Sequence, residues 1–350
     1  MHARARRPVS PRRPEQAGAL PRQVQGLRLS DAHPRLAAIV AQARGQARGE
    51  RPVVGIVHAA DAAALVAARR IAEEGIARPL LIGDRDLIVR AAAAAEVDES
   101  AFEIEATSAD PRAAAEHAVA LVHAKAVRAL MKGSLHTDEL MSAVIHKGTG
   151  LRGERRISHA FVFDLPRYPK LLALADCVVN IAPSALAKRD ILGNAIDLLR
   201  AIGVVRPKAA IVAAVETVNP AIQATLDAQT LVDLARQHRA WGDAIVEGPL
   251  GFDNAISAEA ARTKGIVSQV AGDADLLLVP DLNAGNMLYK SFVYIGGGEC
   301  AGLVLGARVP IVLTSRADSL VARISSVALA MLASPQGPND QELGLTTSRP

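Results

Sequence analysis

Short apolar runs alternate with stretches of helical spacing along residues 50–335. Residues 52–59 form a β-rich run, and residues 61–75 have helical spacing with Asp61 at the start and Gly75 at the end, both common helix-capping types. We expect further strands at 78–84, 127–134, 159–165, 176–183, 208–216, 243–250, 274–281, 301–307 and 310–315. We expect further helices at 110–124, 184–202 and 253–264. This alternation predicts an α/β protein with largely parallel sheets.

Polar residues collect where four of these predicted strands end. They are Lys132, Gly133, Ser134, His136 and Thr137; Glu247, Gly248, Pro249 and Asp253; Asp281, Asn283, Gly285 and Asn286; and Thr314, Ser315, Arg316, Asp318 and Ser319. Ligands of open α/β sheets bind beyond the carboxyl ends of the strands, so the four ends suggest a shared cleft. The alternative is ordinary turn and N-cap chemistry, which explains neither Arg316 nor Lys290.

Ser315 and Arg316 stand at a strand-to-helix junction, where free backbone N–H groups and the helix dipole favour an anion. An arginine adds a bidentate donor, so a phosphate or acyl-phosphate group suits this position.

Other chemistries find less support in the sequence. The nine histidines are scattered without a metal-binding spacing, and neither a GxGxxG nor a GxxxxGK[ST] motif occurs. The glycine-rich stretch 294–302 is interpreted as a turn between a helix and a strand. No histidine or acidic partner can be named for Cys300, which argues against a catalytic cysteine.

The basic charge belongs to the N-terminus. Residues 1–30 contain seven arginines and one acidic residue, which gives this segment a net charge of +6. Because the whole chain has a formal charge of +4, the remaining residues have a net charge of −2. This argues against a nucleic-acid-binding surface. We interpret residues 1–30 as a disordered Arg/Pro-rich tail, or as the result of a start codon assigned too early. An organelle presequence is an alternative that the prolines disfavour.

No apolar run is long enough for a transmembrane helix, and the N-terminus lacks the apolar region of a secretory signal. Two cysteines, Cys177 and Cys300, suit a reducing compartment. We therefore expect a soluble cytoplasmic protein that binds neither membrane nor nucleic acid.

The segments "EGPLGFDNAIS", "VAGDADLLLVPDLNAGNMLYK" and "IVLTSRADS" together resemble the phosphate acetyl/butyryl transferases over residues 50–335. The stretches "ALMKGSLHTDELMSAVIHKGTGLR" and "SRADS" are more similar to the butyryltransferase branch, and to the phosphate-acetyltransferase half of fusions with a hydratase, than to the acetyltransferase branch.

The resemblance implies a two-domain α/β fold of the isocitrate/isopropylmalate dehydrogenase type, with mainly parallel sheets and an interdomain cleft. Residues 31–152 plus 297–335 would form the first domain, residues 153–296 the inserted second domain, and residues 336–350 a polar tail. A homodimer is also implied.

The implied reaction converts acyl-CoA and inorganic phosphate into acyl phosphate and CoA, by direct attack of phosphate on the thioester, without metal or cofactor. Ser315 matches the family's catalytic serine and Arg316 the arginine beside it, with Asp318 as a further catalytic candidate. The remaining candidates bind substrate and are Lys132, Gly133, Ser134, Asp281, Asn283, Gly285, Asn286 and Lys290.

The sequence departs from the acetyltransferases at two positions. Ala322 stands where they carry a catalytic aspartate, so Asp318 becomes the candidate base, although it could instead cap the helix. A dedicated base could also be unnecessary, because thiolate is a fair leaving group. Met141 stands where they carry an arginine, and the charge could come instead from Arg152, Arg155 or Arg156.

Two other functions stay open. A degenerate family member could bind CoA or acyl phosphate without catalysis, and the changes at Ala322 and Met141 motivate this alternative. A dehydrogenase of the same fold, using NAD and a metal, would need closely spaced aspartates near a strand end, and only Asp281 and Asp318 are candidates.

Overall fold

The computed structural model describes residues 32–47, 51–313, 315 and 318–334. Both predicted tails lie outside these ranges. No helix in the described ranges has both the length and the apolar character needed to cross a membrane.

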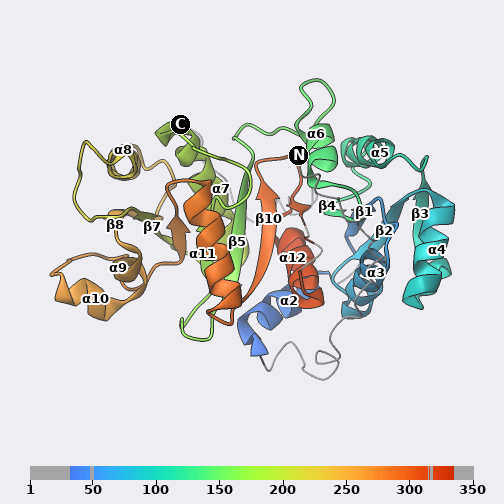
Figure 1. Ribbon diagram of the computed structural model, residues 1–350, viewed down its shortest axis with the longest axis horizontal. Coiled ribbons are helices and arrows are strands. Elements are labelled where there is room, and N and C mark those ends of the chain that lie inside the picture. Colours follow the sequence, from blue (N-terminus) through green and yellow to red (C-terminus); the bar gives the residue numbers. More distant parts are fainter. Residues whose placement is uncertain (1–31, 48–50, 314, 316–317, 335–350) are drawn as a thin grey trace, which may run out of the picture.

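A single sheet runs through the described part of the chain (Figure 1). Its strands are β1 (Val53–Val57), β2 (Arg78–Gly83), β3 (Glu103–Ala106), β4 (Ala129–Lys132), β5 (Ser158–Asp164), β6 (Leu172–Ala175), β7 (Lys208–Val212), β8 (Ile245–Leu250), β9 (Leu276–Leu278), β10 (Glu299–Leu305) and β11 (Ile311–Val312). They lie in the order β3-β2-β1-β4-β11-β10-β5-β6-β9-β7-β8.

Helices cover both faces of this sheet. They are α2 (Pro34–Gln46), α3 (Ala62–Glu74), α4 (Arg85–Ala95), η2 (Glu99–Ala101), α5 (Pro111–His123), α6 (Thr137–Ile145), α7 (Ala185–Ala201), α8 (Gln223–His238), α9 (Phe252–Ile256), α10 (Ala258–Thr263), α11 (Leu282–Tyr294) and α12 (Leu320–Ala333). One hydrophobic cluster extends along one face beneath α2, α3, α4, α7, α8 and α12. Two separate clusters cover the opposite face, one beneath α5 and α6 and one beneath α9 and α11.

The direction of the strands reverses in the middle of the sheet. Pairings β11–β10, β10–β5 and β5–β6 are antiparallel, and the other pairings among the described strands are parallel. Strands β1, β4 and β11 therefore finish on one rim of the sheet, which we call the Ser315 rim. Strands β6, β7, β8 and β9 finish on the opposite rim, which we call the Asp281 rim.

This arrangement confirms an α/β fold with a mainly parallel sheet. Most predicted strands are present, and Gly296–Gly298 turn the chain between α11 and β10 as predicted. The strand predicted at 176–183 is wrong, because β6 ends at Ala175 and the Asp176 carboxylate accepts the backbone N–H groups of Val178 and Val179 at 2.9 and 3.0 Å. Such local side-chain hydrogen bonds compete with a strand ladder. The division into two domains stays a prediction.

Aromatic stacking fixes α11 across the centre of the sheet. The rings of Phe161 on β5 and Tyr289 on α11 are stacked, with centroids 4.3 Å apart and an interplanar angle of 6°. A Cβ at Gly302 of β10 would lie 2.6 Å from the Phe161 ring, so the glycine makes room for it. The helix thereby runs from the Asp281 rim back toward the Ser315 rim.

Candidate active site

The loop between β11 and α12 holds Ser315 and Asp318 in one short turn. The Ser315 backbone N–H donates to Asp318 Oδ2 at 2.6 Å, and the Asp318 N–H donates to the Ser315 carbonyl at 3.2 Å. Ser315 is exposed and Asp318 is half-buried. Two hydrogen bonds therefore fix the relative position of these two predicted catalytic residues. Arg316, the third, lies outside the described residues.

The first turn of α12 is capped by Ser319. Its Oγ accepts the Ala322 N–H at 2.9 Å and donates to Glu299 Oε2 at 2.6 Å. The alternative that Asp318 caps this helix is therefore wrong, and its carboxylate serves the Ser315 turn instead. Ala322 is buried and offers no polar group where the acetyltransferases carry their aspartate.

The end of β4 brings a second set of predicted residues beside this turn. Strands β4 and β11 are parallel neighbours, with Val312 paired to Met131, so Lys132 leaves the sheet next to the Ser315 turn. The Lys132 Nζ donates to the carbonyl of Leu135 at 2.9 Å. A lysine at this place supplies positive charge to the Ser315 rim.

Gly133 and Ser134 pack against the end of β1. A Cβ at Gly133 would lie 2.4 Å from the His58 carbonyl oxygen, so no larger residue fits without a backbone shift. The Ser134 hydroxyl donates to the same carbonyl at 2.9 Å and lies 2.6 Å from His58 Nδ1. His58 is buried and has a φ of 55°, which is uncommon outside glycine.

Burial and the surrounding polar groups act on Asp318 in opposite directions. Burial raises the pKa of Asp318, whereas the Ser315 N–H, the Arg323 guanidinium and the Lys132 ammonium lower it, with burial prevailing. A carboxylate whose pKa is raised is a better proton acceptor than an ordinary aspartate. Asp318 thus has the surroundings of an acid–base group.

Sequence reasoning missed Arg323, Glu299 and His58. Arg323 Nη2 donates to the Ser315 carbonyl at 2.7 Å, and Glu299 holds the Ser319 hydroxyl. One signal was available for Arg323, because it is the only charged residue in the apolar sequence of α12. Glu299 gave no signal, since it begins an antiparallel strand and not the carboxyl end of a parallel one.

The "PDLNAGN" segment lies at the Asp281 rim, away from Ser315 within one chain. The Asp281 carboxylate caps α11 by accepting the Ala284 N–H at 2.9 Å. A Cβ at Gly285 would lie 2.5 Å from the Asp176 carbonyl oxygen, so the glycine allows α11 to pack closely. Asn283 is exposed and Asn286 is half-buried. Substrate binding by these residues stays a prediction.

The C-terminal half of α11 approaches the Ser315 turn more closely. Burial raises the pKa of Tyr289, and the charges of Cys300 and Asp318 raise it further. Lys290 is exposed on the next position of the helix. The expectation that all four polar strand ends open on one cleft is wrong for a single chain, because the sheet reverses direction between them.

The proposed substitutes for the family's missing arginine also lie elsewhere. β5 begins on the Asp281 rim, where Arg155 pairs with Asp197 and Arg156 Nη1 donates to Asn180 Oδ1 at 3.3 Å. Arg152 donates to the Ile145 carbonyl. That one of them replaces the charge of the family's arginine stays a prediction.

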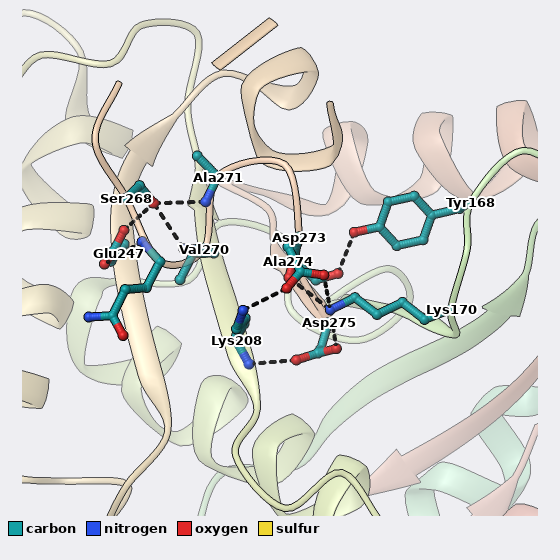
Figure 2. Close-up of polar contacts among 11 residues, drawn as sticks. Tyr168, Lys170, Lys208, Glu247, Ser268, Val270, Ala271, Asp273, Ala274 and Asp275 are labelled. Atoms are coloured by element: carbon teal, nitrogen blue, oxygen red, sulfur yellow. Dashed lines mark hydrogen bonds and ion pairs between the residues drawn. The ribbon is translucent and has the colours of Figure 1, made fainter. Parts of the chain in front are cut away.

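Glu247, predicted at another polar strand end, lies within β8 and has a structural role. Its carboxylate accepts the Ser268 hydroxyl, whose Oγ accepts the N–H groups of Val270 and Ala271 at 2.9 and 2.7 Å (Figure 2). These contacts shape the turn before β9.

The second polar cluster in Figure 2 consists of lysines and aspartates that form ion pairs with one another. Lys170 Nζ lies 2.7 Å from Asp273 Oδ1 and 2.7 Å from Asp275 Oδ1, and Lys208 Nζ lies 2.6 Å from Asp273 Oδ2. Two lysines thus match two aspartates at the starts of β7 and β9, which ties these strands together.

Cys300 is free and buried at the start of β10. Burial raises the pKa of its thiol, and the charges of Glu299 and Asp318 act in the same direction. A thiol held protonated is a poor nucleophile, in agreement with the sequence interpretation. Within the described ranges, no three side chains of His, Cys, Asp or Glu converge as metal ligands would.

Comparison with known proteins assigns the chain to a family. Residues 112–331 match the family described as phosphate acetyl/butaryl transferase, and the chain belongs to it, which confirms the resemblance. The chain is 50% identical to a phosphate acetyltransferase of Rhizobium meliloti over 82% of its length and 90% of the relative. It is 41% identical to a probable phosphate butyryltransferase of Bacillus subtilis, over 81% of its length and 93% of the relative.

From its sequence motifs, the chain is predicted to be more similar to the butyryltransferase branch. These identities do not support that prediction, because the chain is more identical to the acetyltransferase than to the butyryltransferase. That place stays a prediction.

Solved structures agree with the fold. A branched-chain phosphotransacylase from Enterococcus faecalis superposes with a TM-score of 0.72 at 29% identity, covering 81% of this chain and 98% of the other. A 4-hydroxythreonine-4-phosphate dehydrogenase from Burkholderia phymatum superposes with a TM-score of 0.52 at 15% identity, covering 83% and 100%. The second comparison concerns the fold alone and confirms its dehydrogenase-like character.

Proposed function

We propose that the chain is an acyl-CoA:phosphate acyltransferase, which converts acyl-CoA and inorganic phosphate into acyl phosphate and CoA. The observation that carries the proposal is the Ser315–Asp318 turn, held beside Lys132 on one rim of the sheet in a member of this family. The acyl group is short, and its length stays open.

The reaction we propose is a direct displacement. A phosphate oxygen forms a bond to the thioester carbonyl carbon, negative charge collects on the carbonyl oxygen, and the carbon–sulfur bond then breaks to release CoA thiolate. Asp318 accepts the proton that the attacking phosphate loses. Ser315 donates to the carbonyl oxygen or to the leaving sulfur, an interaction of the kind that usually contributes most to catalysis.

Positive charge around the turn supports the binding of phosphate. Lys132 stands beside the turn, and its charge acts on Asp318. Arg316 is part of the proposal through the family resemblance, as the group that grips phosphate. Gly133 and Ser134 would shape the wall beside Lys132, while Asp281, Asn283, Gly285, Asn286 and Lys290 are proposed to bind substrate.

We further propose a homodimer in the cytoplasm. The family resemblance supports the dimer. The two cysteines, Cys177 and Cys300, are both free and buried, which agrees with a reducing compartment.

Trapping of the product tests this function. The protein is incubated with acetyl-, propionyl- or butyryl-CoA and phosphate, and hydroxylamine converts any acyl phosphate into the hydroxamate. Hydroxylamine also reacts directly with the acyl-CoA thioester, so the expected result is hydroxamate above this background only when both phosphate and enzyme are present. Tight CoA binding with hydroxamate no higher than the background would favour the non-catalytic alternative, which the replacement of the family's aspartate by Ala322 motivates.

A further inference from the structure

Arg323 is a buried cation on α12, close to the N-terminal end of the helix. Its exposed fraction is 8%, and its guanidinium Nη2 donates to the Ser315 carbonyl at 2.7 Å. A buried ion is costly unless hydrogen bonds and opposite charge compensate it. The N-terminal end of a helix also carries partial positive charge, which disfavours a cation there. Local helix energetics therefore do not explain an arginine at this position.

The contacts of Arg323 lead to the reacting loop. The Ser315 carbonyl receives two donors, the Arg323 guanidinium and the Asp318 N–H at 3.2 Å. The Asp318 carboxylate in turn holds the Ser315 N–H at 2.6 Å. A single buried guanidinium thus fixes a turn whose two ends carry the proposed donor and the proposed proton acceptor.

We propose that Arg323 is a positioning residue for acyl transfer, which holds the Ser315–Asp318 turn in its reactive geometry and supplies part of the positive charge that faces Asp318. This inference rests on the proposed function and deepens it. Arg323 acts through Ser315 and Asp318 and does not itself touch the substrate.

The groups that face Asp318 come from several elements. Lys132 at the end of β4 and Arg323 on α12 favour its charged form. The charge of Asp318 in turn raises the pKa of Tyr289 on α11 and of Cys300 on β10, so both side chains interact electrostatically with Asp318. Glu299 lies next to Cys300 and adds a like charge on this side.

Loss of the guanidinium has a directional consequence. A side-chain cation that lowers the pKa of Asp318 disappears, so the carboxylate takes up its proton at a higher pH. If Asp318 must be ionised to accept a proton, the acid limb of the kcat profile moves to higher pH.

The test compares Arg323→Gln and Arg323→Lys with the wild-type chain, using phosphate-dependent thiol release from acyl-CoA between pH 4 and 9. The pH series thus begins close to the ordinary aspartate pKa of 3.8. For Arg323→Gln we expect kcat to fall at least about 10-fold and the acid limb to move up by about one pH unit, as removal of a nearby opposite charge does. Arg323→Lys keeps the charge and should restore the position of the acid limb. Arg69→Gln, an exposed arginine on α3, is the matched control and should leave both unchanged.

A double variant separates positioning from mere stability. The Asp318→Asn protein should lack the acid limb, so adding Arg323→Gln should leave its pH profile unchanged, because the group through which the charge acts is gone. Thermal unfolding of each variant confirms that the folded protein is measured.

Two results would overturn the inference. In the first, wild-type protein is active and Arg323→Gln lowers only the melting temperature, with kcat and its pH profile unchanged; the proposed function then stands without Arg323. In the second, wild-type protein shows no phosphate-dependent release, and both proposals fall together.

Discussion

Ser315 and Asp318 hold each other through both ends of one turn: the Ser315 N–H donates to the Asp318 carboxylate at 2.6 Å, and the Asp318 N–H donates to the Ser315 carbonyl at 3.2 Å. The carboxylate is therefore placed by the same backbone that presents the serine. A change in one residue is expected to disturb the other, so their effects on rate should not be additive.

Asp318→Asn removes the proposed proton acceptor and leaves a side chain of the same shape. Burial raises the pKa of Asp318, so its basic form is lost as the pH falls through a value above 3.8. We expect kcat to drop about 10²-fold, the usual contribution of a general base, and the acid limb assigned to Asp318 to disappear. Steady-state kinetics from pH 4 to 9 measure both, with Asp98→Asn as a control at an exposed position remote in sequence. An unaltered acid limb in Asp318→Asn would assign the proton transfer to another group.

Direct attack by phosphate predicts the behaviour of the enzyme when phosphate is absent. Labelled CoA should then not exchange into acyl-CoA, because no acyl group is transferred to the protein. The buried, protonated thiol of Cys300 supports this expectation. Rapid exchange without phosphate would instead demonstrate an acyl-enzyme and contradict the direct displacement.

Gly285→Ala should destabilise the protein although alanine is the better helix former. The new Cβ would lie 2.5 Å from the Asp176 carbonyl oxygen, a backbone atom that cannot move without shifting the turn after β6. Overpacking of this kind costs about 1–3 kcal/mol. Gly45→Ala in α2 is the matched control, because nothing lies within 4 Å of its Cβ, and it should stabilise by about 0.5–1 kcal/mol. Urea unfolding of both variants gives the two free energies, and equal values would contradict the close packing of α11.

His159 makes stability depend on pH. Burial lowers the pKa of His159 to about 4, from an ordinary value of 6.5, while Asp176 opposes the shift. The unfolded chain then binds a proton that the folded protein excludes, so stability present above pH 6.5 is lost as the pH falls toward 4. The expected loss between pH 7 and pH 5 is about 2 kcal/mol from this group.

Urea unfolding of the wild-type protein and of His159→Leu at pH 7 and pH 5 measures that loss. The variant should lack this part of the pH dependence, since no titrating group remains at the position. Identical pH dependence in the two proteins would contradict a neutral buried His159.

Much of the fold could be predicted from the alternation of apolar runs and helical spacing, and the caps at Asp61 and Gly75 appear in the structure as predicted. The reversal of the sheet at β10 and β5 could not, because strand direction depends on long-range pairing that periodicity does not encode. For the same reason, Asp281 and Ser315 looked alike as residues after strands, although they lie on opposite rims of the sheet.

The residues of the site, too, could be predicted only in part from the sequence. Lys132 and Ser315 were found because both follow parallel strands, and β4 and β11 are neighbours. Arg323 reaches the turn from within α12, and Glu299 reaches the adjacent Ser319 from the start of an antiparallel strand. Their roles depend on contacts at 2.7 and 2.6 Å that only the folded chain creates.

Catalysis by Ser315 is tested by thiol release from acetyl-, propionyl- and butyryl-CoA. Wild-type protein and Ser315→Ala are assayed side by side, with and without inorganic phosphate. We expect release by the wild-type protein only with phosphate, and a rate lower by about 10²–10³-fold in the variant, as for loss of one donor to a developing oxyanion. The Ser100→Ala variant, at an exposed serine in η2, should keep the wild-type rate. Phosphate-dependent release that is equally fast in Ser315→Ala would contradict a catalytic Ser315, and release that ignores phosphate would contradict the acyltransferase itself.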